Sequence, residues 1–246
     1  MKENKYDDPV FFEKYSQMER SKKGLKGAGE WSELEKLLPD FRGKKVLDLG
    51  CGYGWHCRYA AEHGALSVLG TDLSEKMLGR ARQINSCEGV EYRLTAMEDL
   101  EFDDSSFDVV LSSLAFHYVR DFQPLVGKIS RFLKPGGDFV FSVEHPVFTA
   151  YGTQDWYYGE NKEILHFPVD NYYYEGAREA VFLGEKVTKY HRTLTTYLNT
   201  LLECGFELTH IVEPQPPEEM MGLPGMRDEM RRPMMLLGSA VKRQSG

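Results

Sequence analysis

Three glycines at alternate positions follow one short apolar segment of the sequence, and an aspartate ends the next apolar segment. The glycines lie in Asp48-Leu49-Gly50-Cys51-Gly52-Tyr53-Gly54, and the aspartate is Asp72, 20 residues after Gly52. Glycine lets a backbone turn sharply and approach a ligand closely, and a helix that begins there offers unpaired N–H groups. In a doubly wound sheet, Asp72 would lie beside this turn and accept hydrogen bonds from ribose hydroxyls. The pair predicts a nucleoside-containing ligand; the alternative is a glycine turn and a helix-capping aspartate without a ligand.

A dinucleotide site fits this turn less well. Such sites need G-x-G-x-x-G, whose third glycine lets the helix pack closely. Here Trp55-His56-Cys57 follows Gly54, so no glycine stands at the required offset. The acidic Asp48 before the first glycine also suits a cofactor with a cationic amino-acid moiety better than a pyrophosphate.

Four segments resemble the class I S-adenosylmethionine-dependent methyltransferases in their small-molecule type 11 form. They are VLDLGCGYG, GTDLSEKML, FDVVLSSLAFHYV and LKPGGDFVFSVEHP, in family order and spacing within residues 44–145. The resemblance implies a Rossmann-like methyltransferase fold and S-adenosylmethionine as cofactor, with S-adenosylhomocysteine as product.

The resemblance also implies a set of cofactor-binding residues. Asp48, Gly50, Cys51 and Gly52 would lie at the glycine turn and near the methionine moiety. Asp72 would bind the ribose, and Leu73 and Met77 would lie by the adenine. Ser112 and His117 would line the cavity. Tyr15 and Arg20 resemble a family segment that folds over the cofactor. Family members often carry an acidic residue after the third strand, where this chain has Ala96, so we expect Glu98 or backbone groups of Met97 to contact the adenine instead.

Two histidines are candidates for the catalytic base. Methyl transfer is an in-line displacement at a sulfonium carbon, so the protein mainly positions the acceptor and removes its proton. His145, at the end of the fifth strand, titrates near neutral pH; alternatively it bonds a neighbouring loop and fixes the turn before Pro146. His117 follows the fourth strand and either transfers a proton or lines the cavity. His191 and Arg192 open the predicted late helix, where they contact the acceptor or face solvent.

These side chains require a sheet to position them. Short apolar runs predict five strands at residues 45–49, 66–72, 90–94, 107–112 and 138–143, with helices at 55–63, after Ser74 to 85, and at 124–133 before a Lys134-Pro135-Gly136-Gly137 turn. Residues 206–212 and 234–241 can supply two more strands, and residues 190–204 have helical spacing. The alternation predicts an α/β fold with a doubly wound, mainly parallel, seven-stranded sheet.

Residues 146–189, after the fifth strand, are rich in aromatic residues and lack a helical period. A connection of this length rarely lacks structure, so we expect an insertion with its own strands that covers the cavity mouth and binds the acceptor. Its aromatic side chains form a small core or line an apolar lid. The predicted units are a helical segment over the cofactor site (1–43), the cofactor-binding core (44–145), the insertion (146–189) and the rest of the core sheet (190–246).

The composition is that of an ordinary globular protein. The 246 residues carry a formal net charge of -8, which argues against a general nucleic-acid binder. No apolar run approaches the roughly 18–20 residues of a membrane span, and the first residues lack the apolar core of a signal peptide. The four cysteines form no CxxC pair and no zinc spacing occurs, so we expect no metal, reduced thiols and a cytoplasmic protein.

We therefore hypothesise a methyltransferase that acts on O or N of a small molecule, as a monomer or homodimer, without nucleic-acid or membrane partners. One alternative is an RNA or protein methyltransferase, which the net charge and the Ser112-Ser113-Leu114-Ala115 sequence after the fourth strand disfavour. Another is a non-catalytic S-adenosylmethionine-binding protein, because function belongs to the site and not to the fold.

Overall fold

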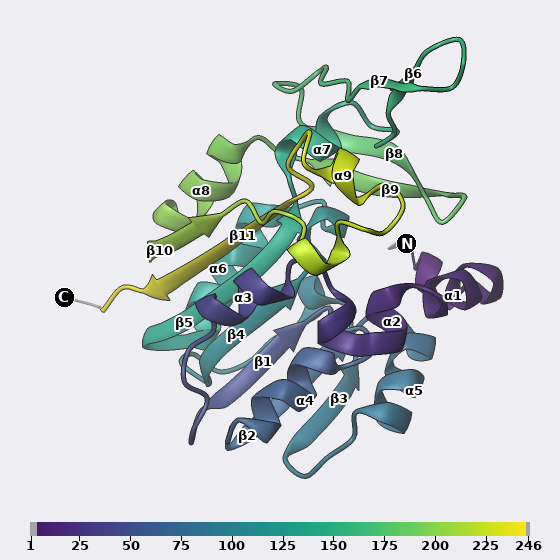
Figure 1. Cartoon of the computed structure of the whole chain (residues 1–246). Coiled ribbons are helices and arrows are strands. Elements are labelled where there is room, and N and C mark those ends of the chain that lie inside the picture. The colour runs from purple at the N-terminus through teal and green to yellow at the C-terminus, as the bar shows by residue number, and fades with distance from the viewer. Residues whose placement is uncertain (1–3, 245–246) are drawn as a thin grey trace.

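Seven strands form one sheet in the order β10-β11-β5-β4-β1-β2-β3 (Figure 1). The structure is a computed structural model and describes residues 4–244. The strands are β1 (Lys45–Leu49), β2 (Ser67–Asp72), β3 (Val90–Leu94), β4 (Phe107–Ser113), β5 (Leu133–Glu144), β10 (Phe206–Val212) and β11 (Met235–Lys242). β11 runs antiparallel to β5 and β10, and the other neighbours are parallel. The mainly parallel, doubly wound sheet is confirmed.

The strand order reverses at β1. This strand pairs with β2 on one side, where Leu47 is opposite Leu69, and with β4 on the other, where Leu47 is opposite Val110. In open α/β sheets, ligands bind beyond the carboxyl ends of the strands at such a reversal. The predicted glycine turn follows β1 at this point.

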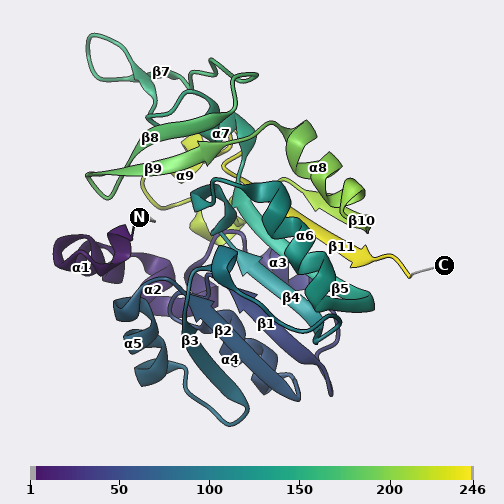
Figure 2. The same cartoon turned by 180° about the vertical axis from the view of Figure 1, so that it is seen from behind.

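Helices cover both faces of the sheet (Figures 1 and 2). One face carries α3 (Trp31–Leu37), α4 (Trp55–Glu62) and α5 (Glu75–Ile84), and the other carries α6 (Phe122–Phe132) and α8 (Leu194–Glu203). On α6, Leu125, Val126 and Ile129 are buried at helical spacing and pack on the sheet, as an amphipathic helix requires. The Ser74 hydroxyl accepts the N–H of Met77 at 3.1 Å, so the predicted cap of α5 is confirmed.

The insertion has its own strands, as predicted. A short helix, α7 (Pro146–Ala150), leads to two antiparallel hairpins, β6 (Tyr157–Tyr158) with β7 (Ile164–His166) and β8 (Gly176–Phe182) with β9 (Glu185–His191). The β8–β9 hairpin lies beyond the carboxyl ends of the sheet strands, on the same side as the N-terminal helices (Figure 2).

The remaining elements are short. The N-terminal segment contains η1 (Lys5–Asp7), α1 (Pro9–Ser16), α2 (Glu19–Lys23) and η2 (Gly24–Gly27). Single 3-10 turns η3 (Met97–Asp99) and η4 (Phe116–Tyr118) follow β3 and β4, and η5 (Glu218–Met220) and α9 (Met226–Glu229) lie in the loop before β11.

Two predicted boundaries are wrong. The late helix begins at Leu194 rather than Tyr190, and His191 ends β9, where it is opposite Gly176. Pairing with β8 and the alternating burial of the strand outweigh the helical spacing of these residues. β5 begins at Leu133, so the predicted turn at 134–137 is the irregular first part of that strand, where its register with β4 shifts.

Candidate active site

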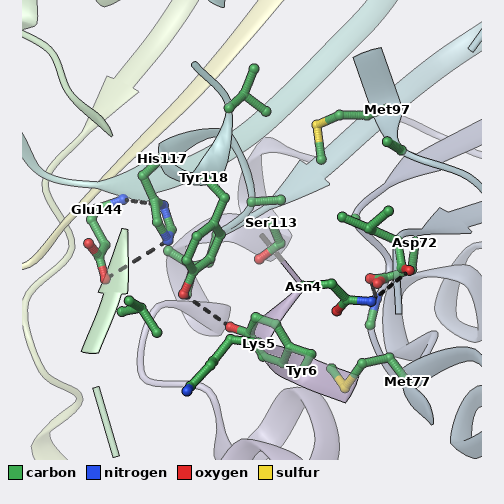
Figure 3. A pocket seen from close by; sticks show the side chains of 18 of the residues that line it. Asn4, Lys5, Tyr6, Asp72, Met77, Met97, Ser113, His117, Tyr118 and Glu144 are labelled. Carbon is green, nitrogen blue, oxygen red and sulfur yellow. Dashed lines mark hydrogen bonds and ion pairs between the residues drawn. The ribbon is translucent and has the colours of Figure 1, made fainter. Parts of the chain in front are cut away.

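A cavity of about 680 Å³ lies beyond the carboxyl ends of the central strands. Its size is within the range of small-molecule and cofactor sites, about 300–1,000 Å³. The floor comes from the loops after β1 to β5, and the roof from the N-terminal segment and from β9. Figure 3 shows Asp72 and Met77 at one end and His117 and Glu144 at the other.

Asp72 is fixed at its end of the cavity by backbone N–H groups. Its Oδ2 accepts from Gly52 N at 2.9 Å and its Oδ1 from Ser74 N at 2.8 Å. Burial raises the pKa of Asp72. A carboxylate offers about four acceptor positions, so after these two bonds the side chain can still accept from ribose hydroxyls.

The glycine turn is packed too closely for side chains. Gly50 has φ +71° and Gly52 has φ +53°, a region that glycine adopts without strain. A Cβ atom on Gly50 would lie 2.5 Å from the Cβ of Ala115. The Gly50 and Cys51 N–H groups both donate to the Thr71 carbonyl, at 2.8 and 2.9 Å. These contacts fix the backbone of the turn, and Gly50 and Gly52 expose it to the cavity without a side chain in between.

Most of the predicted cofactor residues meet at this cavity. Those that line it are Tyr15, Arg20, Gly50, Gly52, Asp72, Leu73, Met77, Met97, Glu98 and His117. Their individual contacts with the cofactor stay predictions. Asp48, Cys51, Ser112 and His145 are not among the lining residues.

Asp48, Cys51 and Ser112 lie behind the turn. The Cys57 Sγ atom donates to Asp48 Oδ2 at 3.2 Å, and burial raises the pKa of Asp48 to about 7. The Ser112 hydroxyl donates to the Leu49 carbonyl at 2.9 Å. All three side chains are buried, and in this position they support the loop that forms the cavity floor.

His145 and His191 both form hydrogen bonds that stabilise neighbouring loops. His145 is the N-cap of α7: its Nδ1 accepts from Val147 N at 3.0 Å, and its Nε2 lies 2.8 Å from Glu213 Oε1. These contacts match the loop-fixing alternative. His191 is fully buried between Thr149, 2.7 Å from its Nδ1, and the carbonyl of Tyr172. It neither faces solvent nor lines the cavity.

A buried polar cluster forms the other end of the cavity. Glu144 Oε1 accepts from Lys189 Nζ at 2.5 Å, and Oε2 accepts from Gln154 Nε2 at 2.6 Å. His117 Nε2 lies 3.9 Å from Glu144 Oε1. Burial alone would raise the pKa of Glu144, but His117, Lys189 and Gln154 together lower it. Burial lowers the pKa of His117 to about 4, so at neutral pH the ring is uncharged and the carboxylate ionised.

Of this cluster, only His117 was predicted from the sequence as a site residue. At the end of β5, His145 was predicted instead, but Glu144 is the residue of β5 that reaches the cavity, because neighbouring side chains of a strand point to opposite faces. Lys189 and Gln154 come from the insertion, 45 and 10 residues away from Glu144. The only local signal was a carboxylate at a strand end.

The N-terminal segment is attached to both sides of the cavity. On the cofactor side, Asp7 Oδ1 accepts from the Ser74 hydroxyl at 2.6 Å and from Lys76 N at 3.1 Å. On the other side, the Tyr6 and Tyr118 hydroxyls lie 3.1 Å apart (Figure 3). Lys14 Nζ donates to Glu185 Oε1 at 3.3 Å, at the tip of the β8–β9 hairpin. Insertion and N-terminal segment together form one roof.

A glycine turn and a strand-end carboxylate beside one cavity define a protein that binds a nucleoside-containing cofactor. Residues 47–141 match the family model described as a methyltransferase domain. A crystal structure assigned to the S-adenosylmethionine-dependent methyltransferases, from Listeria monocytogenes, is 56% identical over 90% of this chain and 100% of that chain, with a TM-score of 0.86. One from Mesorhizobium loti is 43% identical over 89% and 100%, with a TM-score of 0.81. The chain belongs to the S-adenosylmethionine-dependent methyltransferases.

A relative with a named activity matches over a shorter stretch. The ubiquinone biosynthesis O-methyltransferase of Neisseria meningitidis is 35% identical over 129 residues, which are 47% of this chain and 54% of the relative. The chain thus spans about half the length of that enzyme. Within the described part of the chain, no group of His, Cys, Asp or Glu could hold a metal ion. No helix of residues 4–244 is long and apolar enough to cross a membrane.

Proposed function

We propose that this methyltransferase transfers the methyl group to an oxygen or nitrogen of a small molecule bound in the same cavity. The observation that carries the proposal is the extent of the cavity, which continues from Asp72 to Glu144 and Tyr190 under one roof. A roofed site admits a compact molecule more readily than a polymer. The net charge of -8 and the similarity to an O-methyltransferase of ubiquinone biosynthesis support the same acceptor class.

The residues at the Asp72 end fit the cofactor. Asp72 would hold the ribose, Gly50 and Gly52 allow close approach of the backbone, and Leu73 and Met77 flank the adenine position. The tight packing of Gly50 against Ala115 keeps this surface free of side chains. When bound, S-adenosylmethionine supplies a methyl group already activated on a sulfonium centre.

The chain itself contributes positioning and exclusion of water. Ser113 at the end of β4, His117 of η4 and Glu144 at the end of β5 line the cavity, and the proposed acceptor would lie beside them. Tyr6, paired with Tyr118, closes the roof above it. Correct placement of two reactants accounts for a large part of the acceleration of bimolecular reactions.

The test compares acceptor classes directly. The purified protein is incubated with methyl-labelled S-adenosylmethionine and, separately, with small-molecule, RNA and protein fractions of a bacterial extract. We expect label in the small-molecule fraction. Label in RNA or protein instead would contradict the proposal. Binding of S-adenosylhomocysteine without label in any fraction would favour a non-catalytic binding protein.

We further propose that the protein is cytoplasmic and acts as a monomer or homodimer. The four cysteines are free in the structure, which suits a reducing compartment.

A further inference from the structure

Glu144 is a charged residue in the cavity wall that is not among the proposed cofactor-binding residues. Its side chain is 13% exposed, and it lines the cavity at the end opposite Asp72. Burying a carboxylate is costly unless it is paired and hydrogen-bonded. A carboxylate kept at the acceptor end therefore suggests a function there.

The partners of Glu144 hold the carboxylate in place from the protein side. Lys189, 2% exposed, donates both to Glu144 Oε1 at 2.5 Å and to Gln154 Oε1 at 2.7 Å. Gln154 in turn donates to Glu144 Oε2 at 2.6 Å. Each carboxylate oxygen thus has one strong bond from the insertion. A carboxylate has about four acceptor positions, so capacity remains on the cavity side.

His117 also holds Glu144. The Glu144 backbone N–H donates to His117 Nδ1 at 3.4 Å. In a neutral imidazole one nitrogen accepts and the other carries the proton, so the proton of His117 lies on Nε2. That nitrogen is 3.9 Å from Glu144 Oε1. His117 thus bonds the backbone of Glu144 and places its remaining N–H group near the carboxylate, and neither ring nitrogen is left to take a proton from an acceptor.

Aromatic and aliphatic side chains form part of the wall beside Glu144. They belong to Tyr118 of η4 and to Phe182, Val187 and Tyr190 of the β8–β9 hairpin. Lys189 Nζ lies 5.2 Å from the ring centroid of Phe182 and 5.9 Å from that of Tyr118, so aromatic faces surround the ion pair. A ligand beside Glu144 meets aromatic surfaces and an anionic hydrogen-bond acceptor, while Lys5 and Arg120 are cationic residues elsewhere in the cavity lining.

We infer that Glu144 binds the methyl acceptor, and that the acceptor is an uncharged ring compound that donates an O–H or N–H hydrogen bond to this carboxylate. Lys189, Gln154 and His117 are positioning residues that hold Glu144 for this contact. An anionic group in the same place would meet the carboxylate charge and be repelled. This inference rests on the proposed function only in placing the acceptor in this cavity.

The test measures binding and does not depend on turnover. Calorimetry on the S-adenosylhomocysteine complex would compare 2-naphthol, which donates a hydrogen bond, with 2-methoxynaphthalene, which cannot, and with the anionic 2-naphthoate. We expect 2-naphthol to bind about tenfold or more tightly than the other two, since hydrogen bonds to a charged group contribute at least that much. Equal binding of 2-naphthol and its ether, tighter binding of 2-naphthoate, or no binding of 2-naphthol at millimolar concentration would overturn the inference.

Substitutions assign the preference to Glu144. Glu144→Gln keeps a carbonyl for Lys189 but removes the charge, and it should abolish the preference for 2-naphthol while S-adenosylhomocysteine binds as before. Glu144→Asp keeps the charge but withdraws it from the cavity, and should have the same effect if the first variant does not fold. Glu179→Gln, at an exposed position of the same hairpin, is the matched control. Wild-type preference in both Glu144 variants would refute the assignment.

The two proposals can fail separately. A protein that prefers 2-naphthol through Glu144 but labels no small molecule would refute the proposed function; Glu144 would then remain a binding group for uncharged ring compounds, but not for a methyl acceptor. A protein that labels a small molecule but shows no dependence of binding on Glu144 would refute the inference and leave the proposed function standing.

Discussion

Replacing Asp72 with alanine should weaken cofactor binding by about tenfold to several hundredfold. The carboxylate lies at the edge of the cavity with both oxygens already fixed by the N–H groups of Gly52 and Ser74, so it needs no rearrangement to accept from a ribose. A hydrogen bond to a charged group contributes about 1.5–3 kcal/mol. Loss of one such bond, or of two at the weak end of this range, corresponds to about tenfold to several hundredfold in affinity. Titration calorimetry with S-adenosylhomocysteine measures it.

Folding must be separated from binding in this experiment, because Asp72→Ala also leaves two backbone N–H groups without their acceptor. Thermal melting of the ligand-free variant reports that cost. Asp103→Ala, at an exposed aspartate, controls for a general effect of lost charge. If Asp72→Ala remains folded and binds S-adenosylhomocysteine with an affinity within twofold of the wild type, Asp72 does not hold the ribose.

Two further predictions concern the buried floor and the roof. The pKa of Asp48, raised by burial to about 7 from an unfolded value near 3.9, adds stability that is complete below about pH 4 and is lost as pH rises to about 7. Between pH 4 and pH 8, the ligand-free wild type should therefore lose up to about 4 kcal/mol more unfolding free energy than Asp48→Asn. Urea unfolding measures both proteins at both pH values, and an equal change in unfolding free energy for the two would contradict this. The Thr149 hydroxyl lies 2.7 Å from His191 Nδ1, so the two ends of the segment 151–190 are close together and a short Gly/Ser bridge can replace it. This excision should leave S-adenosylhomocysteine binding largely intact and abolish acceptor methylation, and unchanged methylation with unchanged specificity would count against a role of the insertion in acceptor binding.

The sequence predicted the sheet well, because its strands are short buried apolar runs with clear turn signals. Val46 and Leu47 are almost fully buried in β1, and the glycine turn, Asp72 and the Ser74 cap are all local features. The parallel order then follows from right-handed crossovers between neighbouring strands. Local pattern and tertiary structure agree through this part of the chain except at the start of β5, where the predicted turn belongs to the strand.

The acceptor end could not be predicted in the same way. Val187, Lys189 and His191 alternate as the buried face of β9, but a lysine does not look like a core residue until its partner is known. That partner, Glu144, is 45 residues away. The choice between Glu144 and His145 depends on which face of β5 turns toward the cavity, and this orientation is set by packing across the whole sheet.

The attachment of the roof on both sides has a kinetic consequence. The N-terminal segment is tied to the start of α5 through Asp7 and to the β8–β9 hairpin through Lys14. We expect a nucleoside beneath it to exchange with solvent more readily when one of these attachments opens. We therefore expect the residence time of the spent cofactor to depend on the detachment of a short peptide segment, and the overall rate of repeated cycles to depend on that opening as well as on the chemical step.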